Sequence, residues 1–160
     1  MEGQFEIRPI TAAAMVDLRW TVLRPGFPRE SAIFAGDDAI GTLHFGAFMD
    51  KSLVGVASLF DSPMPNAPSS HVPKQLRGMA TLPEVRGSGA GRALLAACVR
   101  SAMETGCDLL WCNARAGAVA FYRKHGWKTC SEEFDIPTVG PHFQMWRPLS
   151  DHSGAGQRAV

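Results

Sequence analysis

Apolar and charged side chains alternate over residues 5–10, which is the pattern of a strand with one buried face. Thr11 can cap the helix that follows, because apolar residues then recur at helical spacing from Ala12 to about Leu23. The two prolines of residues 24–28 end this helix. Residues 29–41 have no clear periodicity, and we expect a loop with a short helical turn.

Two apolar runs, residues 42–48 and 53–60, flank a short turn-rich connector, which predicts a hairpin. Residues 61–73 hold four prolines among small polar residues. This composition indicates a mobile surface loop rather than a linker between domains. The next strand is expected at residues 76–82, and its apolar end leads into a glycine-rich turn.

The clearest helix runs from residue 89 to about residue 104, because its apolar side chains form one broad face, and Gly106 ends it. Residues 108–113 are nearly all apolar, as is typical of a strand covered on both faces. A second helix is expected from residue 116 to about residue 124.

Residues 127–134 and 141–147 complete the pattern as two closing strands. This order of elements predicts a mixed α/β sheet with helices on both faces. At 160 residues the chain is long enough for one domain with one sizeable core, which we place in residues 1–148. Residues 149–160 are small and polar, and we expect them to be a disordered tail.

Charge and hydropathy exclude several classes of protein. The formal net charge is +1 and no basic run occurs, so the footprint of a nucleic-acid-binding protein is missing. The first residues lack a cationic flank before an apolar segment, and no apolar stretch approaches the roughly 20 residues of a membrane helix. We therefore expect a soluble, cytoplasmic protein that does not act on a membrane.

Cysteine and histidine spacing gives no metal site. The four cysteines form no Cys-x-x-Cys pair and lie in or beside periodic apolar segments, so we interpret them as reduced packing residues. The five histidines share no helical or ligand spacing. No metal is expected.

Residues 81–92 have the pattern of an anion-binding turn before a helix. Glycines at positions 87, 89 and 91 leave backbone N–H groups free to converge on phosphate oxygens, and Arg86 and Arg92 add positive charge. A nucleoside triphosphate loop would need Gly-Lys-Ser/Thr, and a dinucleotide fingerprint would need glycine where Arg92 stands. A glycine-rich turn without a ligand is the plain structural alternative.

What remains is Arg-x-x-Gly-x-Gly at Arg86, Gly89 and Gly91, which resembles the coenzyme A pyrophosphate loop of the GCN5-related N-acetyltransferase (GNAT) family. A second match lies downstream in residues 114–127, which resemble the family's Asn-x-x-Ala-x-x-Phe-Tyr-x-x-x-Gly-Phe helix and strand. The shared positions are Ala118, Phe121, Tyr122 and Gly126, with Trp127 at the usual Phe.

One position departs from this second motif. Arg115 stands where many members carry Asn, and Asn113, two residues earlier, is not its positional equivalent. Whether Arg115 takes over the role of that Asn therefore stays open.

The resemblance implies the GNAT fold, a mixed and mostly antiparallel sheet that splays between the strand ending at Leu82 and the strand ending at Asn113. It implies that the pantetheine arm of acetyl-CoA lies in this gap and that its pyrophosphate reaches the glycine turn. The residues that it assigns to the cofactor are Met79, Ala80, Thr81, Leu82, Arg86, Gly87, Ser88, Gly89, Ala90, Gly91, Arg92, Asn113, Arg115 and Phe121.

The reaction that the resemblance implies is direct attack of a neutral amine on the thioester, with a backbone N–H near Thr81 or Leu82 stabilising the oxyanion. Tyr122 becomes the catalytic partner of the leaving thiolate. Full proton transfer from a phenol with a pKa near 10 to a thiol near 8.5 is uphill by about 2 kcal/mol, so we expect a hydrogen bond rather than a transferred proton. A core aromatic role for Tyr122 is the structural alternative.

The base that deprotonates the amine is not identified. Glu84 and His142 are the candidates, against which stand a solvent-facing Glu84 and a His142 with a merely structural role. The segments that cover the acceptor in this fold carry Trp20, Phe27, Phe34 and Phe45, most of them expected in the core.

Three functional hypotheses follow. The leading one is an acetyl-CoA-dependent N-acetyltransferase acting on a small-molecule or exposed protein amine. The alternatives are a non-catalytic acyl-CoA-binding or regulatory module on the same fold and a nucleotide-binding domain that would prefer NAD or ATP to coenzyme A. Many members of the family form homodimers, and the resemblance leaves a homodimer open.

Overall fold

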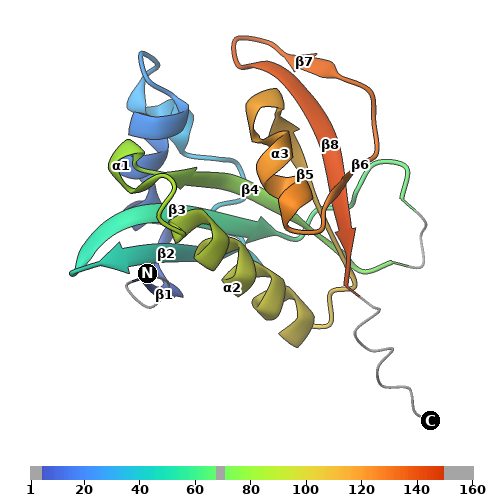
Figure 1. The fold of residues 1–160 in the computed structure, drawn as a ribbon, viewed down its shortest axis with the longest axis horizontal. Coiled ribbons are helices and arrows are strands. Elements are labelled where there is room, and N and C mark those ends of the chain that lie inside the picture. Colours follow the sequence, from blue (N-terminus) through green and yellow to red (C-terminus); the bar gives the residue numbers. More distant parts are fainter. Residues whose placement is uncertain (1–4, 68–70, 150–160) are drawn as a thin grey trace. The chain divides into compact units, whose positions relative to one another are not determined.

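The computed structural model describes residues 5–67 and 71–149 (Figure 1). Its eight strands pair in the order β1-β2-β3-β4-β5-β8-β6, and β7 also pairs with β8. The strands are β1 Glu6–Pro9, β2 Leu43–Met49, β3 Ser52–Phe60, β4 Pro73–Thr81, β5 Leu109–Arg115, β6 Lys128–Thr129, β7 Phe134–Ile136 and β8 Gly140–Pro148. The helices are α1 Ala12–Leu23, η2 Arg29–Ala32, η3 Pro83–Val85, α2 Ala90–Glu104, η4 Ala116–Ala118 and α3 Val119–Lys124.

The predicted mixed and mostly antiparallel sheet is confirmed. The pairs β1–β2, β2–β3, β5–β8, β6–β8 and β7–β8 are antiparallel. The pair β4–β5 is parallel and joins Pro73, Lys74 and Gln75 to Leu109, Leu110 and Trp111.

Packing divides the chain into two compact units. Unit 1 comprises Met1–Asp61 and Leu76–Ser101, and unit 2 comprises Ser62–Gln75 and Ala102–Val160. Strand β4 begins in unit 2 and ends in unit 1. That residues 1–148 form a single domain stays a prediction.

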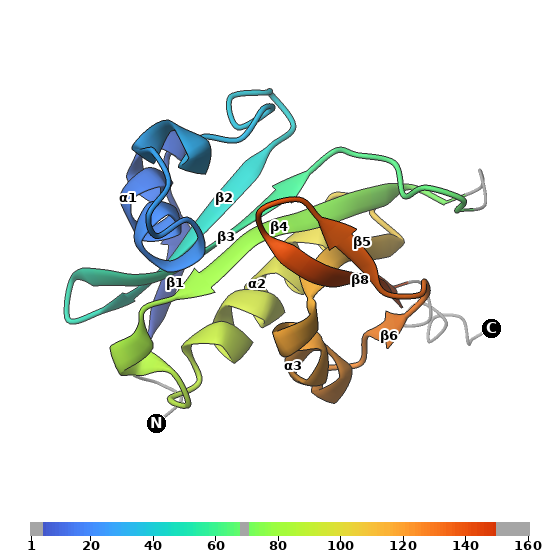
Figure 2. The ribbon, with the colours of Figure 1, turned by 90° about the horizontal axis from the view of Figure 1, so that it is seen from above.

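In unit 1, helices α1 and α2 cover opposite faces of the sheet (Figure 2). Strand β3 shows why, because its successive side chains point to alternate faces. Val56 packs with Met15 and Leu18 of α1 in one apolar cluster. Gly55 faces α2 so closely that a Cβ atom there would lie 2.9 Å from Cδ1 of Leu94. A larger residue at this position would force the Leu94 side chain to move, so glycine suits the close packing of α2 on this strand.

The hairpin between β2 and β3 is tighter than its sequence indicated. Met49 pairs directly with Ser52, so the loop is two residues long. Both loop residues, Asp50 and Lys51, have positive φ, 51° and 73°. This is the backbone of the turns that match the twist of paired strands.

A buried ion pair holds α1 to the loop after it. The Arg19 side chain is fully buried, and it donates from Nη1 to Oδ2 of Asp37 at 2.8 Å and from Nη2 to Oδ1 at 3.1 Å. Arg19 also donates to the carbonyl oxygen of Ala32 and to Oγ of Ser58. Because Asp37 additionally accepts from the Phe34 amide, the pair fixes the path of residues 32–37, which contain little regular structure.

Unit 2 is organised around the antiparallel pair of β5 and β8, which runs from Leu109 opposite Pro148 to Arg115 opposite His142. Its apolar cluster contains Met64, Leu109 and Trp111, with Trp146 packed against it. Asp108 ties three segments together. Its carboxylate accepts from the Val72 amide, its N–H donates to the Val72 carbonyl oxygen, and its own carbonyl oxygen accepts from the Leu149 amide.

Several predicted elements are confirmed with small shifts. Helix α1 has the predicted bounds, and Oγ1 of Thr11 accepts from the Ala14 amide as an N-cap. Helix α2 ends before Gly106, which has a φ of 85°. The single short turn expected after α1 is η2.

Three boundaries were wrong. Strand β4 begins at Pro73 rather than residue 76, because pairing with β5 recruits polar residues that show no strand pattern. The strand expected over residues 127–134 is two short strands, β6 and the start of β7, since only these stretches pair with β8. The helix expected from residue 116 begins as the 3₁₀ turn η4 before α3.

The tail was predicted to begin at residue 149, which is the last residue that the structure describes. Leu149 is buried, whereas residues 150–160, where the rest of the expected disordered tail lies, are outside the described residues. None of the helices in residues 5–67 and 71–149 combines the length and the apolar character that crossing a membrane requires. The same ranges contain no group of three or more His, Cys, Asp or Glu side chains that could hold a metal ion.

The buried ion pair should dominate the stability of unit 1. Asp37→Asn removes one charge from a solvent-excluded pair and should lower the free energy of unfolding by about 3 to 5 kcal/mol. Asp17→Asn is the matched control, because Asp17 pairs with Arg29 at a similarly short distance, 2.7 Å, with both side chains about half exposed or more. Denaturant unfolding should give less than about 1 kcal/mol for that control. Equal losses in the two variants would contradict the assigned role of Asp37.

The same pair predicts the acid dependence of stability. Burial alone raises the pKa of Asp37, but hydrogen bonds from Arg19 and the Phe34 amide and the nearby charges of Arg19 and His44 outweigh it, so the pKa lies below its ordinary value. Such a carboxyl stabilises fully above its unfolded pKa of about 3.9 and loses this contribution as the pH falls through the folded pKa. The stability difference between wild type and Asp37→Asn should hold from pH 7 to about pH 5 and shrink below about pH 4.

Candidate active site

The glycine turn in unit 1 has the backbone that an anion-binding loop requires. Helix α2 starts at Ala90, and Gly87 and Gly89 just before it have φ angles of 81° and 101°. Within the turn, the Arg86 amide donates to the Pro83 carbonyl oxygen and the Ser88 amide to that of Val85. The first amides of a helix have no acceptor inside the helix, so those at the start of α2 are directed at whatever lies beyond the turn.

The surroundings of this turn are open and positively charged. A Cβ atom added at Gly87 would meet no atom within 4 Å, and at Gly89 only Nη2 of Arg92, at 3.7 Å. Arg86 and Arg92 are both exposed. A cation at the start of a helix opposes the helix dipole unless an anion is present, so the charge pattern suits a phosphate.

Strand β4 leads into the turn and presents the predicted backbone of Met79, Ala80 and Thr81. The structure distinguishes between the two backbone N–H groups predicted to stabilise the oxyanion. The Leu82 N–H already donates to the Val54 carbonyl oxygen at 2.9 Å, so this group is committed to the sheet. Of the two predicted donors, only Thr81 stays a candidate.

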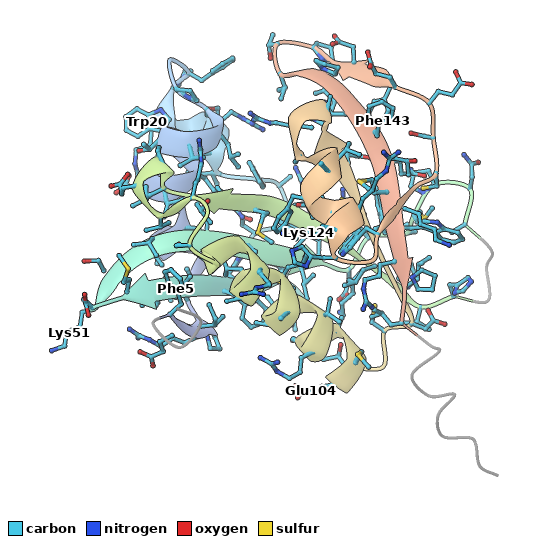
Figure 3. The ribbon with its side chains drawn as sticks, in the orientation of Figure 1. Phe5, Trp20, Lys51, Glu104, Lys124 and Phe143 are labelled. Carbon is cyan, nitrogen blue, oxygen red and sulfur yellow. The ribbon has the colours of Figure 1, made fainter. Side chains whose placement is uncertain are left out.

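In unit 2, Tyr122 lies on α3, which ends at Lys124 (Figure 3). Its side chain is buried between two aromatic rings, with centroid distances of 5.2 Å to Phe121 and 5.3 Å to Trp127. Gly126 follows with a φ of 95°, and the Trp127 amide donates to the Tyr122 carbonyl oxygen. The second motif is therefore a rigid aromatic helix end that fixes the orientation of the phenol.

The two remaining cofactor candidates of unit 2 lie on β5. Asn113 is exposed and pairs in register with Gln144, while Arg115 is half-buried and pairs with His142. Asn113 and Arg115 are two residues apart on one strand, so their side chains point to the same face of the sheet. Asn113 therefore lies on the same face of the sheet as Arg115, the position at which many members of the family carry Asn.

The two candidate bases differ in environment. Glu84 is exposed in η3. His142 is buried, shares a hydrogen bond of 2.7 Å between Nδ1 and the Gly140 carbonyl oxygen, and stacks on the ring of Phe134. These contacts favour the structural interpretation of His142.

The aromatic residues expected near the acceptor are spread over environments. Trp20, at the end of α1 (Figure 3), is half-buried and donates from Nε1 to the Phe27 carbonyl oxygen at 2.7 Å. Phe34 is buried and Phe45 half-buried. Phe27, at 37% exposure, is the one of these four that faces solvent most.

The cysteines have the properties of packing residues. All four are free, and Cys98, Cys107 and Cys112 are buried. Burial raises the pKa of Cys98 to about 12 and raises that of Cys112 further. Because the thiolate is the reactive form, these side chains cannot act as acyl carriers near neutral pH.

Sequence reasoning found the turn and the aromatic helix but missed the cluster around Phe34. The guanidinium groups of Arg19, Arg24 and Arg77 all lie close to this ring. These residues come from three separate segments with no shared spacing, so no sequence signal indicates the cluster.

Comparison with known proteins finds the family that both motifs resemble. The model of the acetyltransferase (GNAT) family matches residues 10–127. The uncharacterized N-acetyltransferase YitI of Bacillus subtilis (strain 168) is 35% identical over 144 residues, which cover 90% of this chain and 96% of YitI.

Solved structures share the fold at lower identity. ElaA of Escherichia coli aligns with a TM-score of 0.72 at 18% identity, over 89% of this chain and 99% of that chain. A chain of the NatC complex bound to Gag peptide and CoA aligns with a TM-score of 0.71 at 14% identity, over 91% of this chain and 99% of that chain. Together with the family match over most of its length, these similarities show that the chain belongs to the GNAT acetyltransferase family.

Proposed function

We propose that this protein is an N-acetyltransferase that moves the acetyl group of acetyl-CoA to a primary amine. The observation that carries the proposal is the open glycine turn before α2, with Gly87 and Gly89 in left-handed conformations and two exposed arginines. This is a site for a polyanion, and in an acetyltransferase family the polyanion of the donor is the pyrophosphate of coenzyme A. The CoA bound in the NatC structure, which shares this fold, supports the assignment.

The proposed donor contacts follow the chain. The backbone of Met79, Ala80, Thr81 and Leu82 would hold the amides of the pantetheine arm, as an added strand would. Residues 86–92 would bind the pyrophosphate through backbone N–H groups and arginine side chains. From unit 2, Asn113, Arg115 and Phe121 would complete the cofactor contacts.

The proposed reaction is a direct transfer. The nitrogen of a neutral amine forms a bond to the carbonyl carbon, the carbon–sulfur bond breaks, and coenzyme A leaves as a thiolate. The Thr81 N–H would donate to the oxyanion, and Tyr122 would donate a hydrogen bond to the departing sulfur. The amine proton passes to solvent or to an exposed carboxylate such as Glu84, since His142 is engaged in structural contacts.

A non-catalytic acyl-CoA-binding module is the second candidate. The observation that favours it is Arg115, which replaces the Asn that many members carry.

Acetyl-CoA is an intracellular co-substrate, and under either function we propose that the protein acts in the cytoplasm as one domain over residues 1–148.

Turnover separates these two functions. Purified protein with acetyl-CoA and a panel of primary amines should release coenzyme A thiol and form the acetylated amine. Tyr122→Phe removes one hydrogen bond to a developing charge and should lower kcat about 10- to 100-fold, with the KM for acetyl-CoA nearly unchanged. Coenzyme A binding without release for any amine, together with no effect of Tyr122→Phe, would instead support the binding module.

The glycine turn can be tested by binding alone. Gly89→Ala forces a side chain into a φ of 101° at the proposed pyrophosphate site and should weaken coenzyme A binding about 10-fold or more in calorimetry. Gly106→Ala is the control, because Gly106 has a φ of 85° at the other end of the same helix. Both variants should lose similar thermal stability, and only the first should lose affinity. An equal affinity loss in both would show that strain rather than the site is responsible.

Direct transfer can be distinguished from a cysteine acyl-enzyme. Cys130 is the exposed thiol among the four, and a thiol reagent at pH 7.5 should label it alone in the folded protein. Cys130→Ser should abolish this labelling and keep the full kcat, because no acyl group passes through a thiol. Loss of activity in Cys130→Ser with intact coenzyme A binding would argue for a covalent route.

A further inference from the structure

Three arginines converge on one aromatic ring in unit 1. The guanidinium carbons of Arg19, Arg77 and Arg24 lie 3.9, 4.6 and 5.6 Å from the centroid of Phe34. All three guanidinium carbons therefore lie within 5.6 Å of one point. We call Arg19, Arg24, Arg77 and Phe34 the arginine cluster.

The charges of the cluster do not balance. Asp37 pairs bidentately with Arg19, and it is the acid that faces this group. Arg24 donates to the carbonyl oxygen of its neighbour Leu23, and Arg77 contacts the rings of Phe34 and Phe60. Two positive charges of the cluster thus stay uncompensated among the described residues.

Burial makes this imbalance costly. Arg24 and Arg77 are both half-buried, and desolvation followed by repulsion from Arg19 lowers the pKa of each. The charged groups that act on Arg77 are Arg19, Asp37 and Arg24, of which only Asp37 is favourable. Burying like charges together is unfavourable unless an anion is bound between them.

Other arginines of unit 1 are treated differently. Arg8 stacks on Phe48 at 3.8 Å and pairs with Glu6, and Arg29 pairs with Asp17. Arg8 and Arg29 are more exposed and each pairs with an acid, whereas Arg24 and Arg77 are half-buried and form no ion pair with an acid among the described residues. An anion supplied by a ligand would remove this contrast.

A carboxylate suits this group. The guanidinium carbon of Arg77 lies 4.6 Å from the centroid of Phe34 and 5.0 Å from that of Phe60, and the N–H groups of a guanidinium can bind a carboxylate bidentately. Arg77 precedes Met79 by two residues in β4, so their Cα atoms are at most about 7 Å apart. A small molecule can therefore reach from Arg77 to the backbone proposed to hold the thioester.

We infer that the arginine cluster binds the carboxylate of the acceptor, so that the substrate is a small amine that carries a carboxylate. This inference rests on the proposed acetyl transfer, whose acceptor class it names. Arg77 and Arg24 contact the carboxylate, and Arg19, held by Asp37, adds a fixed positive charge behind them. Gly78 has a φ of 66°, and a Cβ atom added there would lie 3.0 Å from Nε of Arg19, so both the backbone conformation and the limited space favour glycine.

Matched pairs of amines test the inference. The wild-type protein is assayed with acetyl-CoA and with phenylalanine against phenethylamine, 4-aminobutanoate against propylamine, and lysine against 1,5-diaminopentane. We expect kcat/KM to favour the carboxylate member of at least one pair by about 10-fold or more, because charge-assisted hydrogen bonds are lost in its partner. β-Alanine is also compared with 2-aminoethylphosphonate, which carries a phosphonate in place of the carboxylate. Equal kcat/KM values within every pair, or a higher kcat/KM for the phosphonate than for β-alanine, would overturn the inference.

Variants locate the effect. Arg77→Met keeps the stem but removes the fork, and it should raise the KM for the carboxylate amine about 10-fold or more while leaving its decarboxylated partner and acetyl-CoA unaffected. Arg8→Met is the matched control, since it also removes a guanidinium from a phenylalanine ring. Should Arg77→Met fail to fold, Arg77→Lys retains the charge and should give a smaller loss of the same selectivity. The same loss of selectivity in Arg8→Met would overturn the assignment.

A binding experiment keeps the inference separate from the proposed reaction. If no amine is acetylated although coenzyme A binds, acetyl transfer fails. Calorimetry of the protein saturated with coenzyme A should then still show binding of a carboxylate amine that is lost in Arg77→Met and kept in Arg8→Met. No binding of any carboxylate compound to the wild type would overturn the inference itself.

Discussion

Arg19 and Asp37 form a bidentate ion pair closed to solvent, and the architecture of unit 1 depends on it. The pair lies between α1, the irregular segment of residues 32–37 and strand β3, where Ser58 accepts from Arg19 and shares a hydrogen bond with His44. A segment with little secondary structure has few hydrogen bonds of its own, so a buried charge pair determines its course. Removing either partner would leave a buried charge without compensation, which costs more than the pair contributes.

The buried ion pair also affects the two neighbouring arginines, Arg24 and Arg77. Arg19 pairs with Asp37, yet its charge still lowers the pKa of Arg24 and of Arg77, whose guanidinium groups lie near the same Phe34 ring. The arrangement is unfavourable without an anion, and one member of the cluster, Arg77, lies on the strand that leads directly into the glycine turn. The proposed donor and acceptor contacts therefore share β4, with the acceptor carboxylate before Gly78 and the thioester after it. Glycine at position 78 leaves room for the Arg19 side chain and allows the positive φ of the strand at this point.

The chemistry proposed for the site needs few reactive side chains. The acetyl thioester is already activated, so the protein has to align an amine, donate to the oxyanion and stabilise a thiolate. In the proposed reaction, a backbone N–H on β4 and the phenol of Tyr122 would perform the last two tasks. The proposed reaction uses no buried thiol, and burial raises the pKa of Cys98 and Cys112.

The sequence by itself determined the family, the sheet class and the two motifs, because these depend on local patterns. Alternation marks β1, helical periodicity marks α1 and α2, and glycines at alternate positions mark the turn before α2. It placed the starts of β4 and α3 and the division of β6 from β7 wrongly, since those boundaries depend on which distant strand supplies hydrogen bonds. Only the tertiary structure decided that the Leu82 N–H is committed to Val54, that His142 is buried against Phe134, and that three arginines from separate segments meet at Phe34. Contacts between residues far apart in the chain have no periodic signature, and their energies arise from burial, which exists only in the folded protein.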